Sequence, residues 1–272
     1  INNEALNRNE ATSMARNSRN KVVAALLRSE LEPNLGLTGT GQEVSIMRST
    51  LVRTGVIENA AGDIKINLNP SQNPMIGNML GEIKAFIGMA REKGCQSFAS
   101  LYETLCSPEG GIALRRELVP IYLAAVLHEY KQQIIIKDRF GQVAITAETI
   151  MQINALPEKY QLEYIDWNPD KVEFVQRMES VFCDAIVGAE KNASPYDYII
   201  SAMKRWYVSL PKYVKEMKTA PDGKRIDKGY AGFIRLLRQN PSGHEFLFQA
   251  IPQAFGYSGF VVGVADNISG AK

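Results

Sequence analysis

The spacing of apolar residues predicts a helix near the start of the chain, over residues 11 to 30. Apolar positions recur there every three to four residues, as on one face of an α-helix. They are Val22, Val23, Leu26, Leu27 and Leu31. Pro33 cannot continue the backbone hydrogen bonding and ends the pattern. A second apolar pattern begins after Gly41 and predicts another helix, which runs to Thr54 and ends at Gly55.

Three glycines precede the second helix, within the stretch GLTGTGQEV. They are Gly36, Gly39 and Gly41. A phosphate loop of the GxxxxGK[ST] type needs a lysine and a hydroxyl where this chain has Gln42 and Glu43. The stretch fits a capping box instead, in which the Thr40 hydroxyl accepts from the Glu43 amide and the Glu43 carboxylate accepts from the Thr40 amide. We therefore expect Thr40 to cap a helix, and we expect no phosphate site here.

Residues 56 to 68 predict a short β-hairpin. Two apolar segments flank an Ala-Gly-Asp turn, and the second alternates apolar and polar residues. The order helix, helix, hairpin is typical of a winged helix, a helix-turn-helix variant whose second helix lies in a DNA groove. Arg53 lies on the polar side of that helix and Arg48 at its edge, and both are candidate DNA contacts. The alternative is a polar side that only meets solvent.

A second winged-helix-like unit is predicted before residue 168. A long apolar helix over residues 112 to 130 precedes a strand at QQIIIKD, a helix capped by Thr146 and a strand at YQLEYIDW. The helix after Thr146 has Glu148 but no lysine or arginine, so we expect it to face a protein rather than phosphates.

Helices alone are predicted from Asn168 onward, where Asn168 is a suitable N-cap and Pro169 a suitable first helical residue. The predicted fold is therefore mainly α with short β-hairpins. It consists of winged-helix-like modules over residues 1–94 and 95–167, followed by a helical bundle in the C-terminal region over residues 168–272.

Composition and charge narrow the partner classes only slightly. The net charge is +2, so attraction to nucleic acid has to come from a local patch. The three cysteines suit neither a zinc motif nor a disulfide framework, which favours a reducing cytoplasm. No apolar stretch reaches the roughly 20 residues that cross a bilayer, so we expect no membrane contact. The chain starts at Ile1, and we expect it to be a piece of a longer polypeptide.

Motifs for catalysis or cofactor binding are missing from the sequence. His128 and His244 are the two histidines, and neither HEYKQ nor HEFLF has the second histidine of a zinc-binding HExxH helix. A GxSxG elbow, a GxGxxG fingerprint and a DxD-type carboxylate cluster are also missing. We expect no catalytic residues, no metal, no cofactor and no enzymatic activity of this chain.

Positive charge is concentrated between residues 204 and 238, where ten basic residues stand against three acidic ones. Aromatic residues are interleaved with them, so the segment suits nucleic acid, whose phosphates attract cations and whose bases stack on rings. The candidate contacts are Lys204, Arg205, Trp206, Lys212, Tyr213, Lys215, Lys224, Arg225, Lys228, Arg235 and Arg238. The alternative is a pair of amphipathic helices with aromatic core faces and solvated lysines.

A family resemblance begins at LYETLCSPEGGIALRRELVPIYLAAVLHEY and continues through QIIIKD, TAETIMQI and PEKYQLEYI. These segments resemble a region after the ATPase core in large P-loop ATPases of bacterial phage-defence systems, of the BREX BrxC and phage-growth-limitation PglY type. GTGQEVSIMRSTLVRTGVI is similar to an earlier segment of that family. The similarity covers about residues 15–190 and consists of patterns rather than catalytic motifs. It departs at Glu109 and Gly110, where the family often has Pro-Tyr-Gly.

The resemblance implies a non-catalytic, winged-helix-rich region of a larger cytoplasmic ATPase that acts on or near DNA. Its partners would be DNA and other subunits or domains of the same polypeptide, and the nucleotide site would lie outside this chain. One alternative is a pure protein-interaction scaffold. A nuclease without recognisable motifs is weaker, because no metal-binding carboxylate set is present in the sequence.

We expect the purified chain neither to bind nor to hydrolyse ATP, because it has no lysine-containing loop to stabilise a triphosphate. Calorimetric titration with Mg-ATP checks this expectation. Specific binding at micromolar concentration would contradict it.

Overall fold

The first predicted helix is present in the computed structural model as α1 (Ser13–Leu26). Thr12 caps it, since its hydroxyl accepts a hydrogen bond from the amide of Ala15 at 3.2 Å. Val22 and Leu26 are fully buried. The apolar stripe that predicts the helix is therefore also the face that packs into the core.

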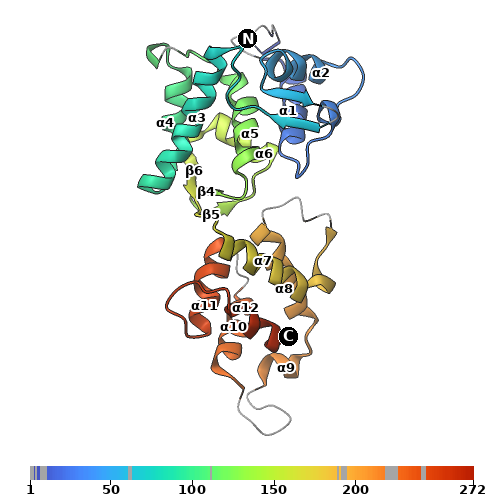
Figure 1. Ribbon diagram of the computed structural model, residues 1–272, viewed down its shortest axis with the longest axis vertical. Coiled ribbons are helices and arrows are strands. Elements are labelled where there is room, and N and C mark those ends of the chain that lie inside the picture. Colours follow the sequence, from blue (N-terminus) through green and yellow to red (C-terminus); the bar gives the residue numbers. More distant parts are fainter. Residues whose placement is uncertain are drawn as a thin grey trace. The chain divides into compact units, whose positions relative to one another are not determined.

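The chain divides into two units, residues 1–166 and residues 167–272 (Figure 1). The structure describes residues 3, 5–6, 11–60, 63–110, 112–188, 190, 195–217, 226–239 and 243–272. The modules expected over residues 1–94 and 95–167 both lie in unit 1, except for Trp167.

Unit 1 combines helices with two small antiparallel sheets. Its helices after α1 are α2 (Gln42–Met47), α3 (Pro74–Lys93), α4 (Phe98–Cys106), α5 (Val119–Tyr130) and α6 (Ala147–Ala155). Its strands are β1 (Ile57–Ala60), β2 (Asp63–Ile66), β3 (Gln96–Ser97), β4 (Ile134–Asp138), β5 (Gly141–Val143) and β6 (Gln161–Tyr164). Short 3-10 segments are η1 (Pro33–Gly36), η3 (Pro108–Gly110), η4 (Arg116–Leu118) and η5 (Pro157–Lys159).

Gly41, not Thr40, is the N-cap residue of α2, and no side chain caps this helix. The predicted capping box is therefore wrong. The Glu43 carboxylate lies instead at the start of its own helix, where its own backbone amide, and then Lys21, lower its pKa. An acidic group at this end is stabilised by the positive pole of the helix.

The helix expected to continue to Thr54 changes into a π-helical segment, η2 (Arg48–Val52). The Thr50 hydroxyl donates to the carbonyl of Ile46 at 2.7 Å. Such bonds from threonine to the preceding turn compete with regular helix geometry. Gly55 then ends the segment with a positive φ of 76°, as predicted.

The sheets differ in part from the expected hairpins. β1 and β2 pair as predicted, with Ile57 opposite Ile66. The second sheet has the order β3-β6-β4-β5, and β5, which the sequence pattern did not indicate, pairs with β4. The turn between them is fixed by the Asp138 carboxylate, which accepts from the amides of Phe140 and Gly141 at 2.8 and 3.1 Å. Helix α6 separates β5 from β6 along the chain, so β6 joins the sheet by a longer connection.

Helix α5 forms the centre of the core of unit 1. Residues 119–127 are all buried, and the helix packs against α1, α3 and α6. Figure 1 shows it between α3 and α1. The Tyr122 hydroxyl donates to the carbonyl of Thr50 at 2.9 Å, which connects α5 to the π-helical segment. A helix that is apolar on every side requires neighbours on every side.

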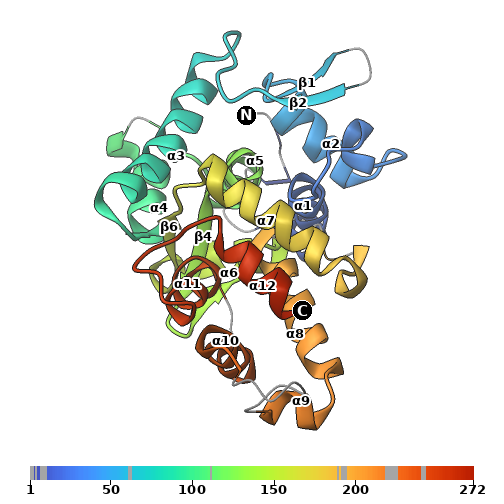
Figure 2. The same ribbon diagram turned by 60° about the horizontal axis from the view of Figure 1, so that its bottom comes forward.

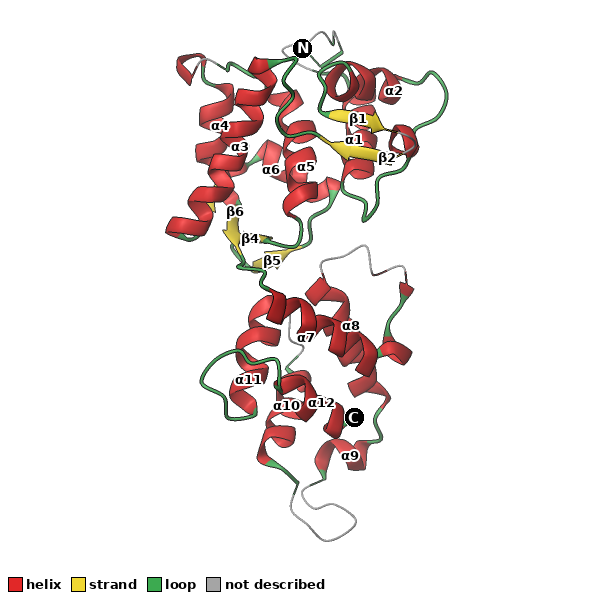
Figure 3. Cartoon of the chain, in the orientation of Figure 1, coloured by secondary structure: helices red, strands yellow, loops and turns green. Residues whose placement is uncertain are grey.

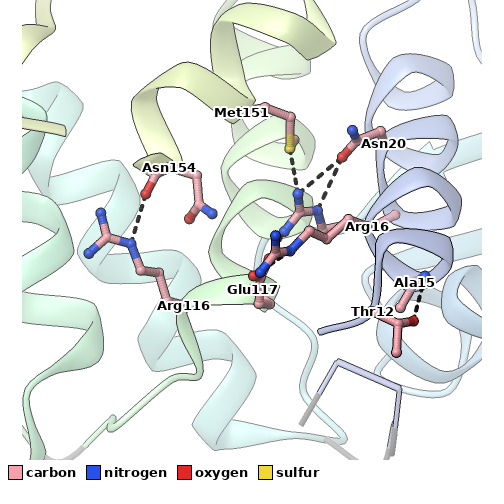
Figure 4. Close-up of polar contacts among 9 residues, drawn as sticks. Thr12, Ala15, Arg16, Asn20, Arg116, Glu117, Met151 and Asn154 are labelled. Atoms are coloured by element: carbon pink, nitrogen blue, oxygen red, sulfur yellow. Dashed lines mark hydrogen bonds and ion pairs between the residues drawn. The ribbon is translucent and has the colours of Figure 1, made fainter. Parts of the chain in front are cut away.

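A buried ion pair connects α1 to the turn in front of α5 (Figure 4). Arg19 of α1 is only 4% exposed and pairs with Glu117 of η4. Its guanidinium also lies 2.8 Å from the sulfur of Met151 in α6. Arg16 reaches the same carboxylate from the surface, at 3.3 Å. Burial lowers the pKa of Arg19 to about 10, so the group is charged at neutral pH and needs its carboxylate.

Unit 2 shows helices and no strand among its described residues (Figure 3). Asn168 caps the first helix as predicted, accepting from the amide of Lys171 at 3.0 Å. The helices are α7 (Pro169–Val181), α8 (Pro195–Ser209), α9 (Lys212–Glu216), α10 (Lys228–Arg238), α11 (Ile251–Ala254) and α12 (Val264–Ala271), with the shorter η6 (Cys183–Ala185) and the π-helical η8 (Phe246–Ala250).

The prediction of a mainly α-helical chain with small β elements is confirmed, and the winged-helix assignment stays a prediction. Across the described part of the chain, no helix has the length and apolar character needed to cross a membrane.

Replacing Glu117 by glutamine should lower the free energy of unfolding of unit 1 by about 3 kcal/mol, because Arg19 is left buried without a counter-charge. Urea denaturation followed by circular dichroism measures the loss. The control is Arg16→Ala, which removes the 51% exposed partner of the same carboxylate and should cost about 1 kcal/mol or less. Equal losses in the two variants would contradict a special role for the buried pair.

Candidate nucleic-acid interface

Side chains from three helices of unit 2 meet at Tyr207, near the end of α8. Figure 2 shows the ribbons of these helices, α8, α9 and α10. Lys215 of α9 places its ammonium 4.9 Å from the centre of the Tyr207 ring. It also donates to the carbonyl of Val208 at 2.9 Å. At the end of α10, Nε of Arg238 donates to the Tyr207 hydroxyl at 3.5 Å. Tyr207 therefore links α8, α9 and α10.

Helix α10 presents a basic side to solvent because its two sides differ sharply in polarity. Its buried residues are Gly229, Phe233, Ile234 and Leu237. Its exposed basic residues are Lys228, Arg235 and Arg238. At 3.6 residues per turn these three share one side of the helix.

The position of α10 is fixed at its first turns. The Asp227 carboxylate caps the helix and accepts from the amides of Gly229 and Tyr230 at 2.8 and 3.2 Å. A Cβ on Gly229 would clash with the Phe255 ring, and one on Gly232 would lie 3.2 Å from the Cβ of Ala254. Close packing against α11 therefore turns the basic side of α10 outward.

Helix α9 adds an aromatic and a second group of lysines. Tyr213 is 71% exposed, and Lys212 beside it is exposed as well. Val208, which precedes α9 along the chain, is also exposed. An exposed tyrosine and an exposed valine next to lysines form a surface that is both apolar and positive.

We call the outward side of these three helices the α8–α10 face. It consists of Tyr207, Val208, Lys212, Tyr213, Lys215, Lys228, Arg235 and Arg238. The carboxylates beside these residues in the described segments are Glu216 and Asp227, and Asp227 serves the helix terminus. Five basic groups against two carboxylates leave the face positive.

Lys204 and Arg205, expected among the phosphate contacts, have structural roles in this unit. Arg205 makes two hydrogen bonds to the Glu190 carboxylate, at 2.8 and 2.7 Å, and a third to the carbonyl of Ala185. The hydrogen bonds from Arg205 lower the pKa of Glu190. Lys204 is half-buried, and burial lowers its pKa against the opposing effect of Asp197. We therefore do not include Lys204 and Arg205 in the α8–α10 face.

Trp206, expected to stack on a base, lies in the core. It is 8% exposed and stacks on Phe233 at 6.2 Å with an interplanar angle of 23°. Its edge contacts Phe182 at 5.7 Å between ring centres. This corrects the expected role, because a ring covered by core aromatics has no free face for a base.

The remaining candidates lie elsewhere in the chain. Arg48 and Arg53 are exposed, but they belong to unit 1, on and just after η2. Lys224 and Arg225 lie outside the described residues. The α8–α10 face thus gathers six of the predicted residues: Lys212, Tyr213, Lys215, Lys228, Arg235 and Arg238.

The described residues form no candidate metal site, and they place His128 in a contact between two helices. No group of three histidine, cysteine or carboxylate side chains is placed there to hold a metal ion. Nδ1 of His128 lies 2.7 Å from the carbonyl of Leu26, and burial lowers the pKa of this imidazole. His128 therefore has a structural contact between α5 and α1.

Comparison with protein-family models, curated proteins and solved structures finds no match to this chain. The resemblance to phage-defence ATPases therefore stays a prediction.

The sequence pattern did not identify Tyr207 as the centre of the face. Arg238 lies 31 positions further along the chain, so local spacing gives no sign that it reaches the Tyr207 hydroxyl. Exposed Val208 was also missed. A signal for its exposure was available in the sequence. Ser209 and Pro211 follow Val208 and mark the end of the helix, where a side chain has fewer neighbours to cover it.

Trp206→Ala should lower the free energy of unfolding of unit 2 by about 3 to 5 kcal/mol, the usual cost of deleting a large buried ring. Chemical denaturation followed by circular dichroism measures this. The control is Tyr213→Ala, an exposed ring whose loss should change stability by about 0.5 kcal/mol or less. A small loss for Trp206→Ala would show that the ring is not part of the core.

Proposed function

We propose that this chain is a non-catalytic nucleic-acid-binding region of a larger protein, and that the α8–α10 face is its contact surface. The observation that carries the proposal is that five basic side chains and an exposed tyrosine belong to three helices that are linked through Tyr207. Three of these basic groups come from α10 alone.

The spacing along α10 suits a chain of phosphates. At 1.5 Å rise per residue, Lys228 and Arg235 are about 10 Å apart along the helix, and Lys228 and Arg238 are about 15 Å apart. One strand of B-form DNA carries a phosphate about every 3.4 Å along the axis. The basic side of α10 therefore faces a length of about four phosphates.

Under the same proposal, unit 1 contributes a second contact with nucleic acid. Helices α1 and α2 pack together and are followed by the β1–β2 hairpin, the order of a winged helix. Arg48 and Arg53 are exposed at the end of its second helix. We propose that this part is winged-helix-like and that these arginines contact the DNA backbone.

We also propose which larger protein contains this region, and this proposal follows the resemblance to phage-defence ATPases. A nucleic-acid-binding region with no site for ATP in its sequence suits a part of a larger cytoplasmic ATPase, of the phage-defence type. DNA and other domains of the same polypeptide would be its partners.

A protein-interaction scaffold is the second candidate, and one observation favours it. A cavity of about 740 Å³ lies between α3 and residues 112–118 of unit 1. Its size falls within the range of ligand pockets. Met75 lines it and is exposed, so a short segment of a partner protein would find an apolar side chain there beside polar groups such as Asn78 and Glu82.

Removing one charge from α10 should weaken nucleic-acid binding and reduce its salt dependence. For Arg235→Gln, the slope of log affinity against log salt should fall by roughly 0.7 on single strands or 0.9 on duplex. Fluorescence anisotropy of a labelled oligonucleotide between 50 and 200 mM salt, about the range over which such slopes are read, gives the slope.

The matched control is Lys93→Gln, which removes an exposed cation at the end of α3 in unit 1. Its slope should equal that of the parent chain. A parent slope near zero would contradict nucleic-acid binding and favour the scaffold.

A further inference from the structure

Tyr213 is the most distinctive member of the α8–α10 face, because its large ring is 71% exposed and lysines flank it in the sequence. It lies on the short helix α9, which begins after Pro211. Lys212 precedes it, and Lys215 follows within the same helix. An exposed aromatic in a positive surface has the two properties of a base-stacking platform, a free ring face and nearby charge for the phosphates.

Contacts of Lys215 and Tyr207 join α9, the helix that carries Tyr213, to α8 and α10. Lys215 is held between the Tyr207 ring at 4.9 Å and the Val208 carbonyl at 2.9 Å. Arg238 holds the Tyr207 hydroxyl from α10. These contacts therefore hold in place the short helix that carries Tyr213.

Val208 extends the apolar part of this surface. Its side chain is as exposed as that of Tyr213, at 72%. Backbone phosphates gain nothing from an exposed valine or a tyrosine ring, whereas bases with free faces do. The apolar groups therefore indicate contact with bases as well as with phosphates.

Bases in a duplex are covered above and below by their neighbours, so a side chain on a protein surface reaches a base face only where the strand is unpaired. We propose that the α8–α10 face takes single-stranded nucleic acid, with a base stacked on Tyr213 and the phosphates along Lys212, Lys215 and the basic side of α10. This inference rests on the proposed function and adds the strand type and the stacking residue.

The test compares a labelled oligothymidine with a duplex of equal length, by fluorescence anisotropy on the full chain at one salt concentration. The parent should bind the single strand more tightly. Tyr213→Ala should weaken single-strand binding by about 5- to 150-fold, the range for loss of one stacked base, and change duplex binding little. Tyr213→Phe should retain the affinity, because the ring and not the hydroxyl makes the contact.

The control for a general effect of exposed aromatics is Phe140→Ala, which removes an 81% exposed ring at the β4–β5 turn of unit 1. It should leave single-strand affinity unchanged, and circular dichroism melting confirms that each variant is folded. If Arg235→Gln weakens binding but Tyr213→Ala does not, the stacking inference is overturned and the proposed function stands. If neither oligonucleotide binds the parent, both are overturned, and a protein partner becomes the occupant of the face.

Discussion

The architecture of unit 1 depends on the charge of Arg19 being neutralised in the core. The guanidinium is 4% exposed, and it reaches Glu117 before α5 and Met151 in α6 from its place in α1. A charge so deeply buried tolerates few alternative arrangements, since a shifted helix would leave it unpaired. The pair thus fixes how α1 packs on the apolar helix α5, whereas apolar packing alone would accept several neighbouring registers.

In unit 2, packing between aromatic side chains holds the helices together. Phe182 and Phe233 enclose Trp206, and this cluster orders α8 and α10 from within. Tyr207, the next residue along α8, links α8 to α9 through Lys215 and to α10 through Arg238. Trp206 thus packs in the core and Tyr207 lies outside it, since successive residues of a helix point in different directions.

The sequence predicted elements better than it predicted their partners. The presence of helices α1 and α7, the N-cap at Asn168 and the β1–β2 hairpin follow from local patterns. Strand β5 is only three residues long, and its pairing with β4 depends on a turn at Asp138, so periodicity gave no signal for it. The composition of the proposed α8–α10 face was predicted in part. Charge marks a segment, but only the fold separates Arg235, which is exposed, from Arg205, which Glu190 neutralises.

Helix α10 approaches α11 closely at two glycines. Gly229 and Gly232 have no side chain to touch a ligand, yet the space they leave for Phe255 and Ala254 sets the direction in which the arginines of α10 point. A methyl group at Gly229 would clash with the Phe255 ring, so either the ring or α10 with its cations would have to shift. If the proposed α8–α10 face binds a partner, a substitution at a glycine on the opposite side of α10 can therefore weaken binding without touching that partner.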